Sequence, residues 1–134
     1  LEAFLRGVQS PPPVPVVVAQ HMPALFTASL SERLGRECGL PVVHADASCA
    51  LRPGVVHVIV GGKHGHVAGS SRAWRLEVNS EPTDALYRPS VNALFASVER
   101  CGARALGVVL TGMGDDGAQG ARSVRGRGGV VLCQ

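Results

Sequence analysis

The chain has 134 residues, of which 46% are hydrophobic, and its formal net charge at pH 7 is +3. This length and hydrophobic content suit one domain with its own core, so no second domain needs to be sought. The 13 basic and 10 acidic residues are spread along the chain, which argues against a basic surface for nucleic acid or an anionic membrane.

Residues 1–8 are predicted to end a helix, because Gly7 and a run of three prolines follow. The segment has no initiator methionine and no apolar stretch long enough for a signal peptide or a membrane span. We therefore expect a cytoplasmic protein without membrane insertion, whose natural chain starts earlier. The four cysteines lie far apart without zinc-site spacing, so we expect buried, reduced thiols.

The valine-rich residues 14–19 predict a central strand of a parallel sheet. A helix is expected to start near Pro23 and to stop at Gly39, with four apolar residues at helical spacing: Leu25, Phe26, Leu30 and Leu34. Further along we predict strands at 41–44 and 55–60, a hairpin at 64–78, a helix at 89–101, a central strand at 105–110, a helix at 117–127 and a strand at 129–133.

Strands that alternate with helices predict an α/β fold with a doubly wound, mostly parallel sheet, in a Rossmann-like three-layer arrangement. The hairpin is expected to be an antiparallel excursion from this sheet. Because the last strand ends at Gln134 with no helix to cover it, we expect residues 1–134 to be a partial domain that is truncated at both ends.

Three loops are expected to converge at the carboxyl ends of the strands, which is where functional groups gather in such folds. These loops are Gln20–Pro23, Gly61–His64 and Thr111–Gly117. They bring one histidine, His21, to the same edge as Asp115 and Asp116. An imidazole oriented by a carboxylate can activate a serine or cysteine nucleophile, and the glycines of the third loop let backbone N–H groups approach an oxyanion.

Other roles for these residues stay open. His21 could cap a neighbouring backbone group, and either aspartate could cap the helix that follows it. The glycine loop could cradle a phosphate, although it has no lysine or arginine and two carboxylates would repel the anion. A metal site at His21 and the aspartates lacks a further ligand, and the histidines at 64 and 66 are better explained as a solvated pair on one hairpin face.

Several segments together resemble the catalytic domain of the CheB family of chemotaxis protein-glutamate methylesterases, over essentially the whole chain. They are Gln20-His21-Met22-Pro23 with Phe26-Thr27, Arg52-Pro53-Gly54, Gly61 with His64, Arg88-Pro89-Ser90-Val91 with Leu94-Phe95, and Leu110-Thr111-Gly112-Met113-Gly114 with Asp116-Gly117-Ala118. The resemblance implies hydrolysis of glutamate γ-methyl esters, and in many members deamidation of glutamine, on the cytoplasmic helices of methyl-accepting chemotaxis receptors. It implies no metal and no organic cofactor, and a receiver domain in cis whose phosphorylation relieves inhibition.

The family uses a Ser-His-Asp triad, so the resemblance assigns roles by motif. His21 matches the general base and Asp116 the orienting carboxylate. Met113 and Gly114 lie in the oxyanion loop, and His64 and Arg88 are expected at the rim of the substrate site. Four positions differ from the usual family residue, namely Tyr87 for His, Asn92 for Asp, Val60 for Pro and Gly65 for Met.

The family's nucleophile lies in a turn of the type Gly-x-Ser-x-Gly-Gly, and no serine of this chain has that setting. We expect it upstream of Leu1, so the 134 residues alone should be inactive. The alternative hypothesis is a non-catalytic relative that binds receptors or regulates them. A phosphate- or nucleotide-binding domain is a third.

Overall fold

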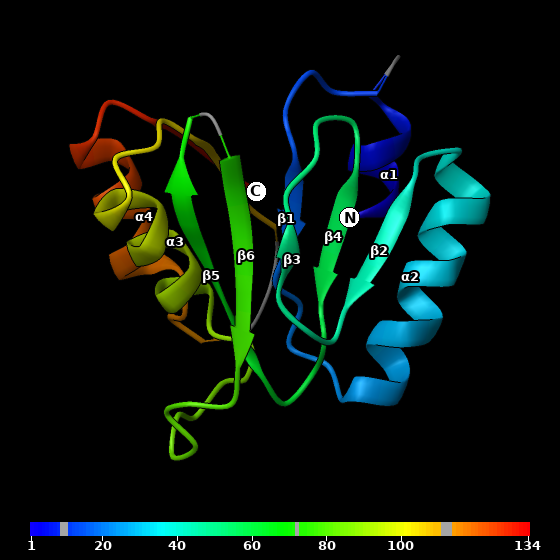
Figure 1. Cartoon of the computed structure of the whole chain (residues 1–134), viewed down its shortest axis with the longest axis horizontal. Helices are drawn as coiled ribbons and strands as arrows, with labels where there is room; N and C mark the ends of the chain where they lie inside the picture. The colour runs from blue at the N-terminus through cyan, green and yellow to red at the C-terminus, as the bar shows by residue number, and fades with distance from the viewer. Residues whose placement is uncertain (9–10, 72, 111–113) are drawn as a thin grey trace.

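The computed structural model describes residues 1–8, 11–71, 73–110 and 114–134, and these form four helices and three small sheets (Figure 1). Parallel strands connected through helices make up two of the sheets, and the third is antiparallel. The predicted α/β class with an antiparallel hairpin is therefore confirmed. Within the described ranges, no helix combines the length and the apolar character needed to cross a membrane.

The first sheet has three parallel strands in the order β1-β4-β2: β1 (Val16–Val18), β4 (Val56–Ile59) and β2 (Val42–Ala45). All four residues of the central strand β4 are buried, which requires cover on both faces. Val56 and Val58 pack into one hydrophobic cluster, and Ile59, on the opposite face, packs into another. The strand is buried on both faces although one of its four residues, His57, is polar.

Helices α1 (Glu2–Arg6) and α2 (Ala24–Cys38) accompany the first sheet, with α2 along its β2 side (Figure 1). α2 ends as predicted at Gly39, which adopts the left-handed conformation with φ 65°. Leu30 and Leu34 are buried, but Leu25 and Phe26 are 76% and 56% exposed. Helical spacing therefore does not place these two residues in the core, because the inward face of the first turns is formed by Thr27 and Ser31 instead.

The second sheet is antiparallel in the order β3-β6-β5: β3 (Cys49–Ala50), β6 (Ala73–Asn79) and β5 (His64–Ser70). The β5–β6 hairpin confirms the prediction. β3 was not predicted, because a strand of two residues is too short to show a periodic pattern. Leu76 of β6 is fully buried in the same cluster as Ile59 of β4, so the hairpin covers the second face of the parallel sheet.

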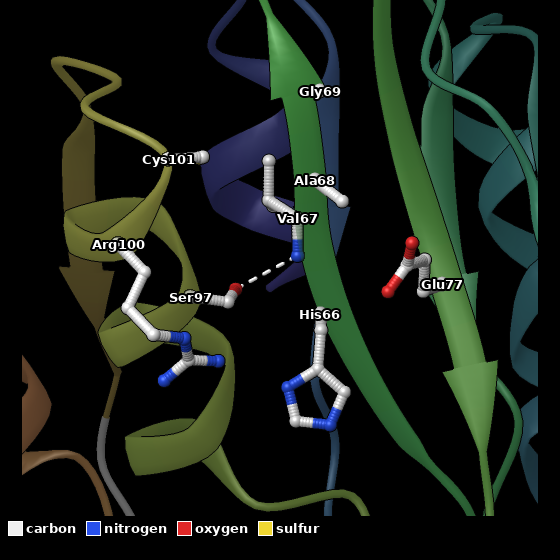
Figure 2. Close-up of a pocket in the computed structure, with 8 residues that line it drawn as sticks. All are labelled: His66, Val67, Ala68, Gly69, Glu77, Ser97, Arg100 and Cys101. Carbon is white, nitrogen blue, oxygen red and sulfur yellow. Dashed lines mark hydrogen bonds between the residues drawn. The ribbon is translucent and has the colours of Figure 1, made fainter.

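The C-terminal part contains α3 (Val91–Arg100), β7 (Leu106–Val109), α4 (Ala118–Gly126) and β8 (Val130–Cys133). α3 packs against β5, where the Ser97 hydroxyl accepts a hydrogen bond of 2.7 Å from the Val67 N–H (Figure 2). The predicted central position of β7 is wrong within the described residues, because β7 pairs with β8 alone and Leu106 is 58% exposed. The cysteines are free as expected, but none is fully buried.

Leu94 tests the packing of α3 on the second cluster, because its side chain is only 4% exposed. Leu94→Ala is expected to lower the free energy of unfolding by about 2–5 kcal/mol, through lost burial and a residual cavity. Leu86→Ala is the matched control, since Leu86 is 87% exposed and its truncation should change stability by less than about 0.5 kcal/mol. Equal urea midpoints for the two variants would contradict this packing.

Candidate active site

His21 and Asp116 are 95 residues apart in the sequence and meet in the structure. The Nε2 atom of His21 lies 2.8 Å from the Oδ2 atom of Asp116. His21 follows β1 and Asp116 precedes α4, so both lie in loops after parallel strands. The expected proximity of imidazole and carboxylate is confirmed.

The loop that carries His21 is held by close contact with Gly61. A Cβ atom at position 61 would overlap the main-chain oxygen of Met22, so only glycine lets the two loops approach this closely. The Gly61 N–H also donates to the hydroxyl of the buried Thr27, at 3.1 Å. The same hydroxyl lies 3.0 Å from Nε2 of His44 on β2. Residues 22–24 thus lie against Gly61, which is linked through Thr27 of α2 to His44 of β2.

The Asp116 carboxylate accepts four hydrogen bonds, and its side chain is only 4% exposed. Besides His21, the donors are the Val91 N–H at 2.7 Å, the Asn92 N–H at 2.9 Å and the Ser90 hydroxyl at 3.0 Å. Burial by itself raises the pKa of Asp116, but the hydrogen bonds from the two N–H groups, His21 and Ser90 outweigh it and hold the pKa below 3.8. Asp116 is therefore a carboxylate at neutral pH.

Asp116 caps a helix other than its own. It satisfies free N–H groups in the first turn of α3, whereas the helix that follows it is α4. Asn92 of α3 returns the interaction, because its Oδ1 accepts from the N–H groups of Gly117 at 3.1 Å and Gly120 at 2.8 Å. This role of Asn92 was not predicted from the sequence. The sequence left two roles open for Asp116, helix capping and contact with His21. Asp116 fills both, because it caps α3 and hydrogen-bonds His21.

The hydrogen bond to Asp116 decides the tautomer of His21. A carboxylate can only accept, so Nε2 carries a proton, and in the neutral imidazole Nδ1 has the lone pair. No described residue hydrogen-bonds Nδ1, and the His21 side chain remains 30% exposed. The arrangement can therefore take a proton from a hydroxyl or thiol that approaches Nδ1, while Asp116 stabilises the resulting imidazolium.

His64 has a structural role instead of a place at an exposed rim. It is 1% exposed, and both ring nitrogens are engaged: Nε2 with the Pro82 carbonyl at 3.2 Å, and Nδ1 with the Ser90 N–H at 3.3 Å. The expected solvated pair with His66 is therefore wrong as well. Arg88 is exposed, and its predicted place at the rim stays a prediction. The described residues contain no group of three or more metal-ligating side chains.

The loop proposed for the oxyanion lies only partly within the described residues. Met113 is outside them, so its predicted role stays a prediction. Gly114 is exposed and has a φ of 94°, which favours glycine. The exposed Asp115 accepts at its main-chain oxygen from the Ala118 N–H at 3.0 Å.

A separate open groove lies between the hairpin and the C-terminal half of α3 (Figure 2). Its lining residues are His66, Val67, Ala68, Gly69, Glu77, Ser97, Arg100 and Cys101. Neither His21 nor Asp116 is among them, so this groove is not the candidate active site.

Comparisons with known proteins point to one family. A family model described as CheB methylesterase matches residues 1–134. The protein-glutamate methylesterase/protein-glutamine glutaminase 1 of Oleidesulfovibrio alaskensis is 44% identical over 91% of this chain and 33% of its own length. The corresponding enzyme 2 of Nitratidesulfovibrio vulgaris is 42% identical over 91% of this chain and 34% of its own length. The chain thus spans about a third of the length of these relatives.

A solved structure is similar over nearly the whole chain. The crystal structure of the Thermotoga maritima CheB methylesterase catalytic domain matches with a TM-score of 0.87 and 30% sequence identity. The match covers 97% of this chain and 69% of that one.

The low pKa of Asp116 predicts a specific pH dependence of stability. Its stabilising contribution is complete above the ordinary value of 3.8 and is lost as the pH falls below 3.8 through the lower value of the folded state. The difference in unfolding free energy between the wild type and Asp116→Asn should therefore shrink as the pH is lowered from about 5 to about 2. Urea unfolding at several pH values measures it, with Asp115→Asn at the exposed neighbouring position as the control. A difference that does not change with pH would contradict the assignment.

The reciprocal cap predicts a cost for removing the Asn92 side chain. Asn92→Ala leaves the N–H groups of Gly117 and Gly120 without their acceptor and should lower the free energy of unfolding by about 1–2 kcal/mol. Asn92→Asp keeps an acceptor oxygen and should retain most of the stability. Chemical denaturation of both variants at pH 7 distinguishes them, and equal losses would show that the acceptor is not what matters.

Proposed function

The chain belongs to the CheB methylesterase family, and from that premise we propose that it forms part of a catalytic domain that hydrolyses glutamate γ-methyl esters on chemotaxis receptors. The observation that carries the proposal is the hydrogen bond between His21 and Asp116, with Nδ1 of His21 left to accept a proton. The printed names of the relatives include a glutaminase activity, so we extend the proposal to the side-chain amide of glutamine.

We propose that the nucleophile is a serine hydroxyl outside these 134 residues. No described serine hydrogen-bonds His21, and the hydroxyl nearest in the network, that of Ser90, is committed to Asp116. Among the described strands, β1 pairs with β4 alone and β7 with β8 alone, so each offers an edge to another parallel strand. The greater length of the curated relatives supports a contribution from a further segment.

In the proposed reaction the serine oxygen attacks the ester carbonyl while Nδ1 of His21 takes the hydroxyl proton. Asp116 stabilises the imidazolium, and backbone N–H groups of the loop at Gly114 stabilise the oxyanion. His21 then gives the proton to the departing methoxide, which leaves as methanol. Water, activated by His21, hydrolyses the acyl-enzyme to the glutamate carboxylate and restores the serine. With a glutamine substrate the leaving group is ammonia.

The setting of this activity is part of the proposal. Receptor glutamates that are methylated face the cytoplasm, so we place the protein there. A receiver domain in cis, whose phosphorylation relieves inhibition, is proposed from the family resemblance, and the length of the relatives is compatible with one. No metal or organic cofactor enters the proposed steps, because the proton transfers need only His21 and Asp116.

The complete protein that carries this chain tests the proposal through methanol release from a γ-methylated receptor fragment. His21→Ala is expected to lower kcat/KM by about 10³-fold or more, and Asp116→Ala by less, because the carboxylate only orients and stabilises the base. His21 is partly exposed, so its loss should leave the unfolding free energy nearly unchanged, whereas Asp116→Ala should also destabilise the first turn of α3.

His66→Ala is the matched control, since it removes another imidazole, in the groove away from the site. It should retain activity close to the wild type. Wild-type turnover in His21→Ala would overturn the assignment of the base. An inactive wild-type protein with no serine in a glycine-rich turn would favour the non-catalytic regulatory module instead.

A further inference from the structure

Tyr87 covers one face of the His21 imidazole. The two ring centroids are 4.5 Å apart and the ring planes differ by 12°, so the rings are stacked. The contact joins two loops that are far apart in the sequence. Parallel stacking of this kind stabilises an aromatic pair beyond the area that it buries.

The backbone that follows Tyr87 is held by contacts at each of the next three residues, the last of which reaches Asp116. The Arg88 carbonyl accepts from the Gly62 N–H at 3.1 Å, and Pro89 is fully buried. The next residue, Ser90, donates its hydroxyl to Asp116 at 3.0 Å. The Tyr87 ring therefore extends from a fixed segment, which makes it a firm support for the imidazole.

The far end of the Tyr87 ring lies against Gly114. A Cβ atom at position 114 would overlap the Tyr87 hydroxyl oxygen and would lie 3.2 Å from Cζ. Tyr87 thus fills the space between the imidazole and the loop that we propose for the oxyanion. Its ring stacks on the His21 imidazole and lies close to Gly114 of that loop.

Two constraints are needed to fix the direction of Nδ1 of His21. The hydrogen bond to Asp116 pins one edge of the ring at Nε2, but the ring can still turn about that contact. The stack with Tyr87 fixes the plane of the ring and so removes this freedom. Nδ1 then points in one direction, as general-base catalysis requires.

We propose that Tyr87 is a positioning residue, whose aromatic face holds the His21 imidazole in the orientation that directs Nδ1 to the nucleophile. The inference rests on the proposed function and adds to it the residue that sets the angle of the base. The aromatic ring of Tyr87 makes the stacking contact that orients His21, and the hydroxyl group is not needed for it.

Kinetics of the complete protein on a γ-methylated receptor fragment test the proposal. Tyr87→Leu keeps an apolar side chain but removes the ring, and should lower kcat about tenfold while KM changes by less than about twofold. Tyr87→Phe keeps the ring and should stay within about twofold of the wild-type kcat. Leu86→Ala, at the exposed neighbouring position, is the control and should leave both constants unchanged.

A spectroscopic measurement reports on the stack independently of activity. The ring current of Tyr87 shifts the His21 ring protons upfield, so these NMR signals should move downfield in Tyr87→Leu and stay in place in Tyr87→Phe. Unchanged His21 signals in Tyr87→Leu would overturn the inference, as would an active wild type whose Tyr87→Leu variant keeps its kcat. Equal losses of kcat in the Leu and Phe variants would also overturn it, because the hydroxyl would then matter. A wild type without esterase activity would instead remove the proposed function itself.

Discussion

The buried carboxylate of Asp116 connects the fold to the site. A charge that is 4% exposed needs several donors, and Asp116 obtains them from the first turn of α3, from the Ser90 hydroxyl and from His21. Because Asn92 caps the start of α4 in return, the N-termini of the two helices fix each other. The direction of the imidazole is therefore tied to helix packing, and any change that loosens α3 against α4 also loosens the site.

The strands and the meeting of His21 with Asp116 could be predicted from the sequence, because they follow from local patterns and from the topology of parallel strands. Valine-rich runs gave the strands, and their common edge brought His21 close to Asp116. What the sequence could not show are partners that depend on tertiary packing. Asp116 precedes α4 but caps α3. His64 was expected in a loop at the strand ends, but it begins β5 and is buried between backbone groups. The exposed Leu25 keeps helical spacing without facing the core.

Four residues around His21 constrain different features of it. Gly61 and Thr27 fix the loop that carries it, Asp116 fixes its proton on Nε2, and Tyr87 fixes the plane of its ring. Each constraint comes from a different part of the chain. Membership of the CheB methylesterase family gives this constellation its proposed chemistry, in which the chain supplies the base and its supports while the serine comes from another segment.

The position of the proton on the His21 ring tests the central claim most directly. ¹⁵N NMR of the imidazole in the complete protein at neutral pH distinguishes a protonated from an unprotonated ring nitrogen. In the neutral form of the imidazole, we expect the proton on Nε2, facing Asp116, and a bare Nδ1. A proton on Nδ1 with a bare Nε2 would contradict it, because Asp116 could then not accept the hydrogen bond on which the site depends.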